Sequence, residues 1–179
     1  MPNTDALERL EQLERMERRI EALEARLQQS EDFAAIQNLK SRYGALADDR
    51  YDRRGPKPPE ALEPIAAEIA SLFTPQGVWD GGKALGLCRG RDEIRARMLK
   101  PTLHFSWHYF VKPKIEIDGD VARGTWDILA PVTTTEGQAM WMAGVEHDEY
   151  ERMDGEWLHS AMKLRVIFMA PHEKGWAQR

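Results

Sequence analysis

Apolar side chains recur at helical spacing through the N-terminal part of the chain, which is otherwise rich in Glu, Arg and Gln. Five of them are spaced at intervals of 3, 4, 3 and 4 residues: Leu13, Met16, Ile20, Leu23 and Leu27. This is the a/d spacing of a coiled-coil seam, and Leu7 and Leu10 extend it out of register. Because so short a helix is marginal alone in water, we expect residues 1–30 to form an oligomerisation helix in a homotrimer or homodimer. A solvated helix with an incidental stripe is the alternative.

A second helix is expected directly after the first. Ser30 followed by Glu31 and Asp32 is typical of an N-cap with acidic residues in the first turn. The buried face of this helix is expected to carry Phe33, Ile36, Leu39, Tyr43 and Leu46. The Pro-rich segment 50–64 predicts a surface loop, and further helices are expected over residues 61–73 and 90–99.

From residue 104 onward the period of the pattern changes from helical spacing to two. Strands are expected over residues 104–112, 114–117, 121–132, 138–152 and 156–169, joined by turns at IDGD, TTTEG and RMDGE. Helices followed by a long antiparallel meander predict an α+β domain over residues 31–179, in which a curved sheet wraps around helices.

Composition narrows the function classes. The chain has 179 residues, 42% of them apolar, enough for one core, and its net charge of −5 gives no basic surface for nucleic acid. Cys88 is the only cysteine, which excludes an internal disulfide and a multi-cysteine zinc site. A charged N-terminus and the lack of a long apolar run predict a cytoplasmic protein without membrane contact. Nucleotide-binding glycine motifs are absent, so NAD or ATP chemistry has no support.

The segment LHFSWHYF holds the first candidate chemistry, because alternation along a strand puts His104 and His108 on one face. Asp127 lies in an otherwise apolar strand, where an unpaired carboxylate would be costly. It therefore needs either a salt-bridge partner, such as Arg165, Lys163 or Arg123, or a functional role. His147 and His159 are interpreted as structural or exposed. No metal site is expected, since the histidines show no close ligand motif.

The chain resembles the SnoaL-like branch of the nuclear transport factor 2 superfamily, from about Phe33 to Met169. The resemblance is carried by IQNLKSRYGALADD, SLFTPQGVWDGG, GRDEIRARM, HFSWHYF, IEIDGDVARGTWDI and GEWLHSAMKLRV, in that order. It implies a cone of curved antiparallel sheet closed by helices over a deep pocket. The family includes eliminating enzymes that use no cofactor, dehydratases among them, and also plain binding proteins.

The resemblance also implies roles for single residues. Tyr43, Asp48, His104 and Asp127 match catalytic positions of the family, and Arg165 falls near a basic residue of its last strand. Asp48 is expected to accept a hydrogen bond from His104, which then acts as the base; Asp49 is its rival. Many members carry Asn four residues after the strand histidine, where this chain has His108. With Trp126 and Arg165, His108 is expected to contact an apolar substrate.

These observations together predict a lyase of dehydratase type, independent of any cofactor, acting on an apolar, cyclic small molecule. His104 would remove a proton from carbon, and Tyr43 with Asp127 would assist the leaving group. Two alternatives stay open: an isomerase that returns the proton to another carbon, and a non-catalytic ligand-binding protein.

Overall fold

The computed structural model describes residues 4–173 and 175, so the outermost residues of both expected domains lie outside it. Its longest element is α1 (Thr4–Asp48), a single helix of 45 residues. The break expected at Ser30 is wrong, since no Gly or Pro interrupts this stretch and Gln28 donates to Asp32 one turn later over 3.1 Å. The side chain of Asp32 points toward the sheet, where Trp157 and Arg152 bind its carboxylate.

The middle of the chain alternates short strands and helices. In order they are β1 (Tyr51–Asp52), β2 (Gly55–Pro56), α2 (Pro59–Ser71), β3 (Phe73–Asp80), α3 (Gly82–Leu85), β4 (Leu87–Arg89) and α4 (Gly90–Met98). The expected surface loop is therefore a tight β1–β2 hairpin, after which α2 begins at Pro59, a position that tolerates the missing N–H.

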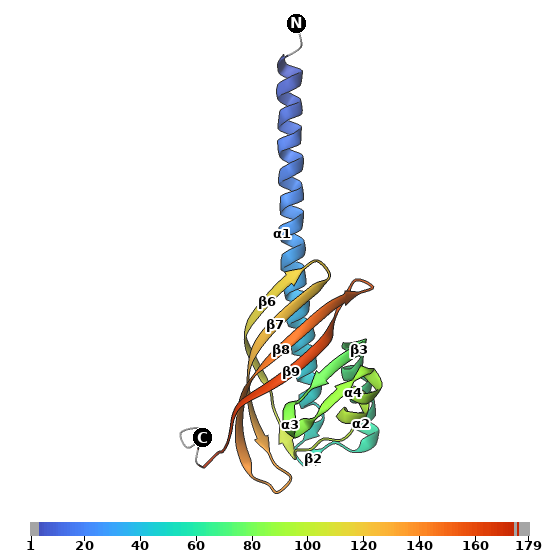
Figure 1. The fold of residues 1–179 in the computed structure, drawn as a ribbon, viewed down its shortest axis with the longest axis vertical. Helices are drawn as coiled ribbons and strands as arrows, with labels where there is room; N and C mark the ends of the chain where they lie inside the picture. The colour runs from blue at the N-terminus through green and yellow to red at the C-terminus, as the bar shows by residue number, and fades with distance from the viewer. Residues whose placement is uncertain (1–3, 174, 176–179) are drawn as a thin grey trace.

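The rest of the chain is sheet. Its strands are β5 (Phe105–Ser106), β6 (Tyr109–Asp118), β7 (Val121–Thr133), β8 (Ala139–Met153) and β9 (Glu156–Pro171). The sheet has seven strands in the order β4-β3-β9-β8-β7-β5, with β6 also paired to β7, and only β3 and β9 run parallel. This confirms the α+β class and the curved, cone-like sheet (Figure 1).

A continuous strand over residues 104–112 is not formed. β5 ends at Ser106 and β6 begins at Tyr109, and the intervening His108 turns its backbone N–H to the Asp48 carboxylate, with N–O distances of 3.1 and 3.2 Å. A bulge follows in β6, where Lys112 has a φ of 53°. The alternation assumed for this segment therefore cannot be extended across it.

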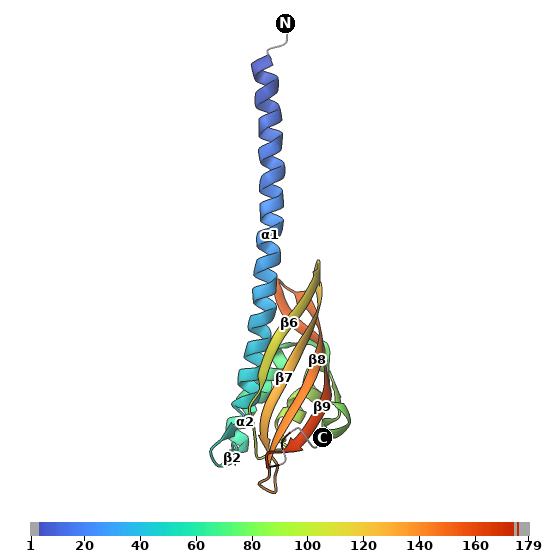
Figure 2. The ribbon, with the colours of Figure 1, turned by 90° about the vertical axis from the view of Figure 1, so that its left-hand side faces the viewer.

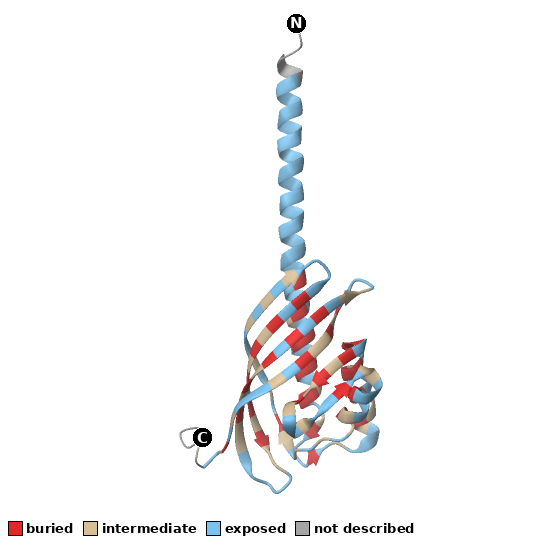
Figure 3. Ribbon diagram, viewed as in Figure 1, coloured by how far each residue is buried: buried red, intermediate tan, exposed pale blue. Residues whose placement is uncertain are grey.

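The C-terminal half of α1 packs against β6 and β9 (Figure 2). α4 packs against both α2 and β3. Ile36, Tyr43, Ile69, Phe73 and Ile94 lie in the common core. The N-terminal half of α1 projects away from the sheet and is exposed on all sides (Figure 3). Within the described part of the chain, no helix combines the length and apolarity that crossing a membrane requires.

Candidate functional site

A pocket of about 340 Å³ lies between the end of α1, α4 and the inner face of the sheet. Most of its wall on the sheet side is apolar, formed by Ile128, Val132, Met142, Leu164, Val166 and Met169. Ile128 and Val132 are four residues apart on β7, so their side chains project from the same face of that strand. Polar groups enter from the other side, mostly from α1, α4 and the β5–β6 segment.

His108 and Asp48 form a closely bonded polar pair at this pocket. The His108 ring lines the cavity, and its Nδ1 lies 2.5 Å from Asp48 Oδ1. Asp48, the last residue of α1, is buried, and it also accepts a hydrogen bond from the backbone N–H of His108. This double attachment fixes the ring and leaves Nε2 as the nitrogen free to accept a proton.

The expected pairing of Asp48 with His104 is wrong. His104 is exposed, does not line the pocket, and lies against the β1–β2 hairpin, where a Cβ on Gly55 would come within 2.7 Å of its ring. The error follows from the broken strand: His108, not His104, stands where the chain crosses the end of α1.

Tyr43 lies in the pocket wall, as expected. Its hydroxyl accepts a hydrogen bond of 2.9 Å from the Trp79 indole N–H, and both side chains line the cavity. Burial, together with the nearby charge of Glu146, raises the pKa of Tyr43 to about 12. The phenol therefore stays protonated near neutral pH, and its own proton can be donated to a bound molecule.

A buried charged cluster, not foreseen from the sequence, borders the same cavity. Lys40 from α1 binds both Glu146 and Asp148 of β8, with an Nζ–O distance of 2.7 Å to Asp148, and Glu146 lines the pocket. Burial alone would lower the pKa of Lys40, but the two carboxylates raise it; burial raises the pKa of Glu146. The signal was available, because Lys40 falls on the buried face of α1 between Ile36 and Tyr43.

Three other expected site residues lie outside this pocket. Asp127 is on the outer side of β7, with its side chain 41% exposed and bound to Lys112 over 2.7 Å, so the salt-bridge alternative holds with a different partner. Arg165 is exposed on β9, between the pocket residues Leu164 and Val166. Trp126 is buried, and its indole donates to Tyr150 over 2.9 Å.

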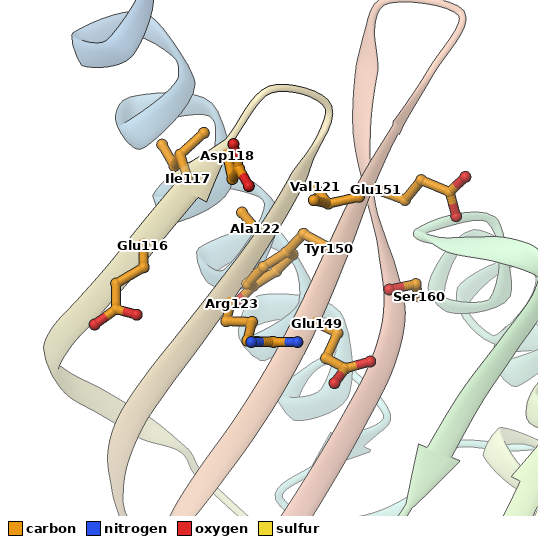
Figure 4. A pocket seen from close by; sticks show the side chains of 10 residues that line it. All are labelled: Glu116, Ile117, Asp118, Val121, Ala122, Arg123, Glu149, Tyr150, Glu151 and Ser160. Carbon is orange, nitrogen blue, oxygen red and sulfur yellow. The ribbon is translucent and has the colours of Figure 1, made fainter.

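A second hollow, of about 390 Å³, lies at the far end of the sheet near the β6–β7 hairpin (Figure 4). Its rim carries exposed side chains such as Glu116, Arg123 and Glu149, the last two being cross-strand neighbours. It holds no histidine and none of the buried charges described above. Among the described residues, no group of three or more His, Cys, Asp or Glu side chains is placed to hold a metal ion.

Residues 64–163 match the family model described as SnoaL-like domain. Among curated proteins, the chain is 27% identical over 143 residues to gamma-hexachlorocyclohexane dehydrochlorinase of Sphingobium indicum, covering 77% of this chain and 82% of the relative. Hexachlorocyclohexane dehydrochlorinase 1 of the same species is also 27% identical, over 77% of this chain and 83% of its own length.

Solved structures show the same fold. A type 2 hexachlorocyclohexane dehydrochlorinase superposes with a TM-score of 0.67 at 25% identity, over 81% of this chain and 91% of the other. An NTF2-like protein with a cystatin-like fold from Novosphingobium aromaticivorans superposes with a TM-score of 0.63 at 20% identity, over 87% and 91%. With the family match spanning more than half of its length, the chain belongs to the SnoaL-like domain family.

Proposed function

We propose that this protein is a lyase, independent of any cofactor, that eliminates a leaving group from an apolar, cyclic small molecule. The observation that carries the proposal is the His108–Asp48 pair at the wall of an otherwise largely apolar cavity. The similarity to dehydrochlorinases supports elimination as the reaction class. Elimination needs no external oxidant or reductant, so acid and base side chains are sufficient for it.

In this proposal the base is His108, in place of the predicted His104. Its Nε2 removes a proton from a carbon of the substrate, and the electron pair of that C–H bond becomes the new C=C bond. The bond to the leaving group on the neighbouring carbon breaks, and that group departs with the bonding pair. Asp48 stays ionised and stabilises the imidazolium cation formed on His108.

Tyr43 is placed to hydrogen-bond the departing atom, because its hydroxyl accepts from Trp79 and retains its own proton. Departing hydroxide would leave as water, with its proton coming from the phenol or from solvent, and departing chloride would need only a hydrogen bond. We propose no chemical role for Asp127, Arg165 or Trp126, which lie away from the cavity.

The matched pair His108→Gln and His104→Gln tests the proposal. Both variants are assayed for chloride release from γ-hexachlorocyclohexane and for loss of water from a panel of cyclic hydroxyketones. We expect His108→Gln to lose at least about 100-fold in kcat, the usual share of a general base, and His104→Gln to stay close to the native protein. Equal activity of His108→Gln and the native protein would remove His108 from the mechanism. Exchange of substrate hydrogen for deuterium without elimination would instead indicate an isomerase.

A further inference from the structure

The pocket holds two arginine side chains that the proposed elimination does not use. Arg50 follows the end of α1, Arg97 lies in the last turn of α4, and both line the cavity and are partly buried. They come from segments far apart in the sequence, and the fold brings them to the same end of the pocket.

The hydrogen bonds of both guanidinium groups go to neutral acceptors. Arg50 donates to the Ala47 carbonyl over 3.1 Å and to the Met98 sulfur over 3.4 Å. Arg97 donates to the Leu85 and Lys100 carbonyls over 3.3 and 2.7 Å, and to the Thr102 hydroxyl over 3.3 Å.

Among the described residues, no carboxylate forms an ion pair within 4.0 Å with either guanidinium. Asp80 lines the same pocket, but its carboxylate accepts the backbone N–H of Gly82 over 2.9 Å, and Glu146 is bound to Lys40. In contrast, Arg42 and Arg152, outside the pocket, each have a carboxylate partner.

The two positive charges are also close enough to affect one another. The pKa of Arg97 is lowered mainly by burial and, to a smaller extent, by the positive charge of Arg50. Two like charges at one end of a partly buried cavity are unfavourable without a counter-ion, and a planar carboxylate is the anion that a guanidinium binds best.

We propose that Arg50 and Arg97 bind the carboxylate of the substrate, which makes the substrate class of this pocket apolar cyclic carboxylic acids. Carboxylate binding by the two arginines does not depend on the proposed function; only the identification of the bound acid as the substrate does. The Arg97 guanidinium carbon lies 5.7 Å from the centre of the Trp79 ring, and Trp79 in turn contacts Tyr43. The carboxylate would therefore sit next to the Trp79–Tyr43 wall, with the ring of the acid against Met142 and Leu164.

Binding tests this without any turnover. Calorimetric titration of the native protein with a panel of cyclohexane and naphthalene carboxylic acids is compared with titration of their neutral amides. We expect at least one acid to bind at least tenfold more tightly than its own amide, with an affinity that falls as salt is added. If every amide binds as well as its acid, the proposal is wrong.

Variants locate the charge responsible. Arg50→Gln and Arg97→Gln are each expected to weaken acid binding at least tenfold and leave amide binding unchanged. Arg95→Gln is the matched control, since Arg95 lies on the same helix, is exposed and pairs with Glu63. His108→Gln should keep the preference for acids even if it abolishes elimination, so the two proposals fail separately. Native acid binding in both pocket variants would overturn the assignment. The assignment would also be overturned if both variants turned over neutral substrates more slowly and the native protein showed no preference for acids. That result would indicate that the arginines contact the leaving group.

A second inference comes from the exposed part of α1. Leu13, Met16, Ile20, Leu23 and Leu27, with Leu7 and Leu10 before them, are each 51–60% exposed, and nothing in the described part of the chain covers them. Leu13, Ile20 and Leu27 are the a positions of this seam. The e positions, four residues later on one flank, are Glu17, Glu24 and Glu31. On the other flank, the g positions directly before Ile20 and Leu27 are Arg19 and Arg26.

The charges on these flanks select an orientation. In a parallel pair of helices, each g residue faces the e residue five places later on the other copy, so Arg19 meets Glu24 and Arg26 meets Glu31. An antiparallel pair places arginine opposite arginine and glutamate opposite glutamate. We infer that the seam is covered by a second copy of this chain in a parallel coiled coil.

A charge swap and a cross-link test this inference. Light scattering should show that Arg19→Glu/Arg26→Glu weakens self-association, and that adding Glu24→Arg/Glu31→Arg restores it. Met16→Cys should form a disulfide-linked dimer under oxidation, because only a parallel, in-register pair brings residue 16 of both copies together. A monomeric native protein at all concentrations, or no cross-link in an associated Met16→Cys variant, would overturn it.

Discussion

Asp48 and Asp49 are neighbours in sequence, and their surroundings assign them different roles. Asp48 is buried and holds His108 through both its ring and its backbone N–H. Asp49 is exposed and accepts a hydrogen bond of 2.5 Å from Lys57. The sequence could not separate the two, because their order along the helix says nothing about which carboxylate reaches the β5–β6 segment.

Replacing each of the two aspartates by Asn separates the roles by experiment. In Asp48→Asn the imidazolium that forms during proton abstraction loses its counter-charge, and we expect kcat to fall at least about 100-fold. Asp49→Asn removes only a surface pair and should change kcat less than about threefold. Steady-state kinetics on any substrate that the native protein turns over gives both values; similar losses in both variants would contradict the role of Asp48.

Tyr43→Phe should affect poor leaving groups more than good ones. Without the phenol, departing hydroxide loses its hydrogen-bond donor, so we expect a loss of about tenfold or more in kcat for loss of water. Chloride needs less assistance, and its release should slow less. The same substitution leaves the Trp79 N–H without its acceptor, which should lower the free energy of unfolding by about 1–2 kcal/mol. Equal losses for both leaving groups would leave Tyr43 a purely structural residue.

At the scale of elements, the sequence pattern worked best where the chain alternates regularly. The expected strands over 121–132, 138–152 and 156–169 differ by at most two residues at either end from β7, β8 and β9. The pattern failed at Ser30, where a good local cap was overridden by contacts of Asp32 with the sheet. It failed again at His108, whose backbone N–H bonds to Asp48 and not to a neighbouring strand. Both failures are tertiary contacts between residues distant in sequence, which local periodicity cannot register.

The buried bridge between α1 and β8 makes a prediction about stability. Lys40→Met leaves Glu146 and Asp148 buried without their counter-ion, and we expect the free energy of unfolding to drop by about 3–5 kcal/mol. Adding Glu146→Gln and Asp148→Asn to Lys40→Met should restore at least part of that loss. Urea unfolding of the native protein and both variants measures this, with the exposed Lys114→Met as control. A loss below about 1 kcal/mol in Lys40→Met would contradict a structural role for the bridge.

At the scale of the whole molecule, one long helix serves two different surroundings. Its C-terminal half lies in the core, contributes Tyr43 to the cavity wall, and binds the lining residues Glu146 and His108 through Lys40 and Asp48. Its N-terminal half stands free of the sheet (Figure 1). Because α1 is continuous, self-association of the free half would hold the domains of different copies side by side, with their pockets on separate chains.

His159 connects the stability of the whole molecule to pH. Its ring is fully buried among Phe73, Tyr43 and Tyr150, and among the described residues neither ring nitrogen has a hydrogen-bond partner. Burial lowers the pKa of His159 to about 3; Asp148, at 4.0 Å, opposes this shift, and Lys40 adds to it. The folded protein therefore keeps this ring neutral in mild acid, whereas the unfolded chain takes up a proton there below about pH 6.5.

Because the unfolded state binds the extra proton, the free energy of unfolding should fall as the pH is lowered through this window. At about 1.4 kcal/mol per unit, the loss between about pH 6.5 and pH 5 approaches 2 kcal/mol. Urea unfolding across this range should show that slope in the native protein and in the exposed control His147→Gln, and a much flatter profile in His159→Phe. Asp32 titrates below this window, because its hydrogen bonds lower its pKa despite burial. Burial raises the pKa of Glu146, but Glu146 is present in the native protein and in both variants, so its contribution cancels when their slopes are compared. If His159→Phe keeps the native slope, the pH dependence of stability has another source, and the buried ring is not its sensor.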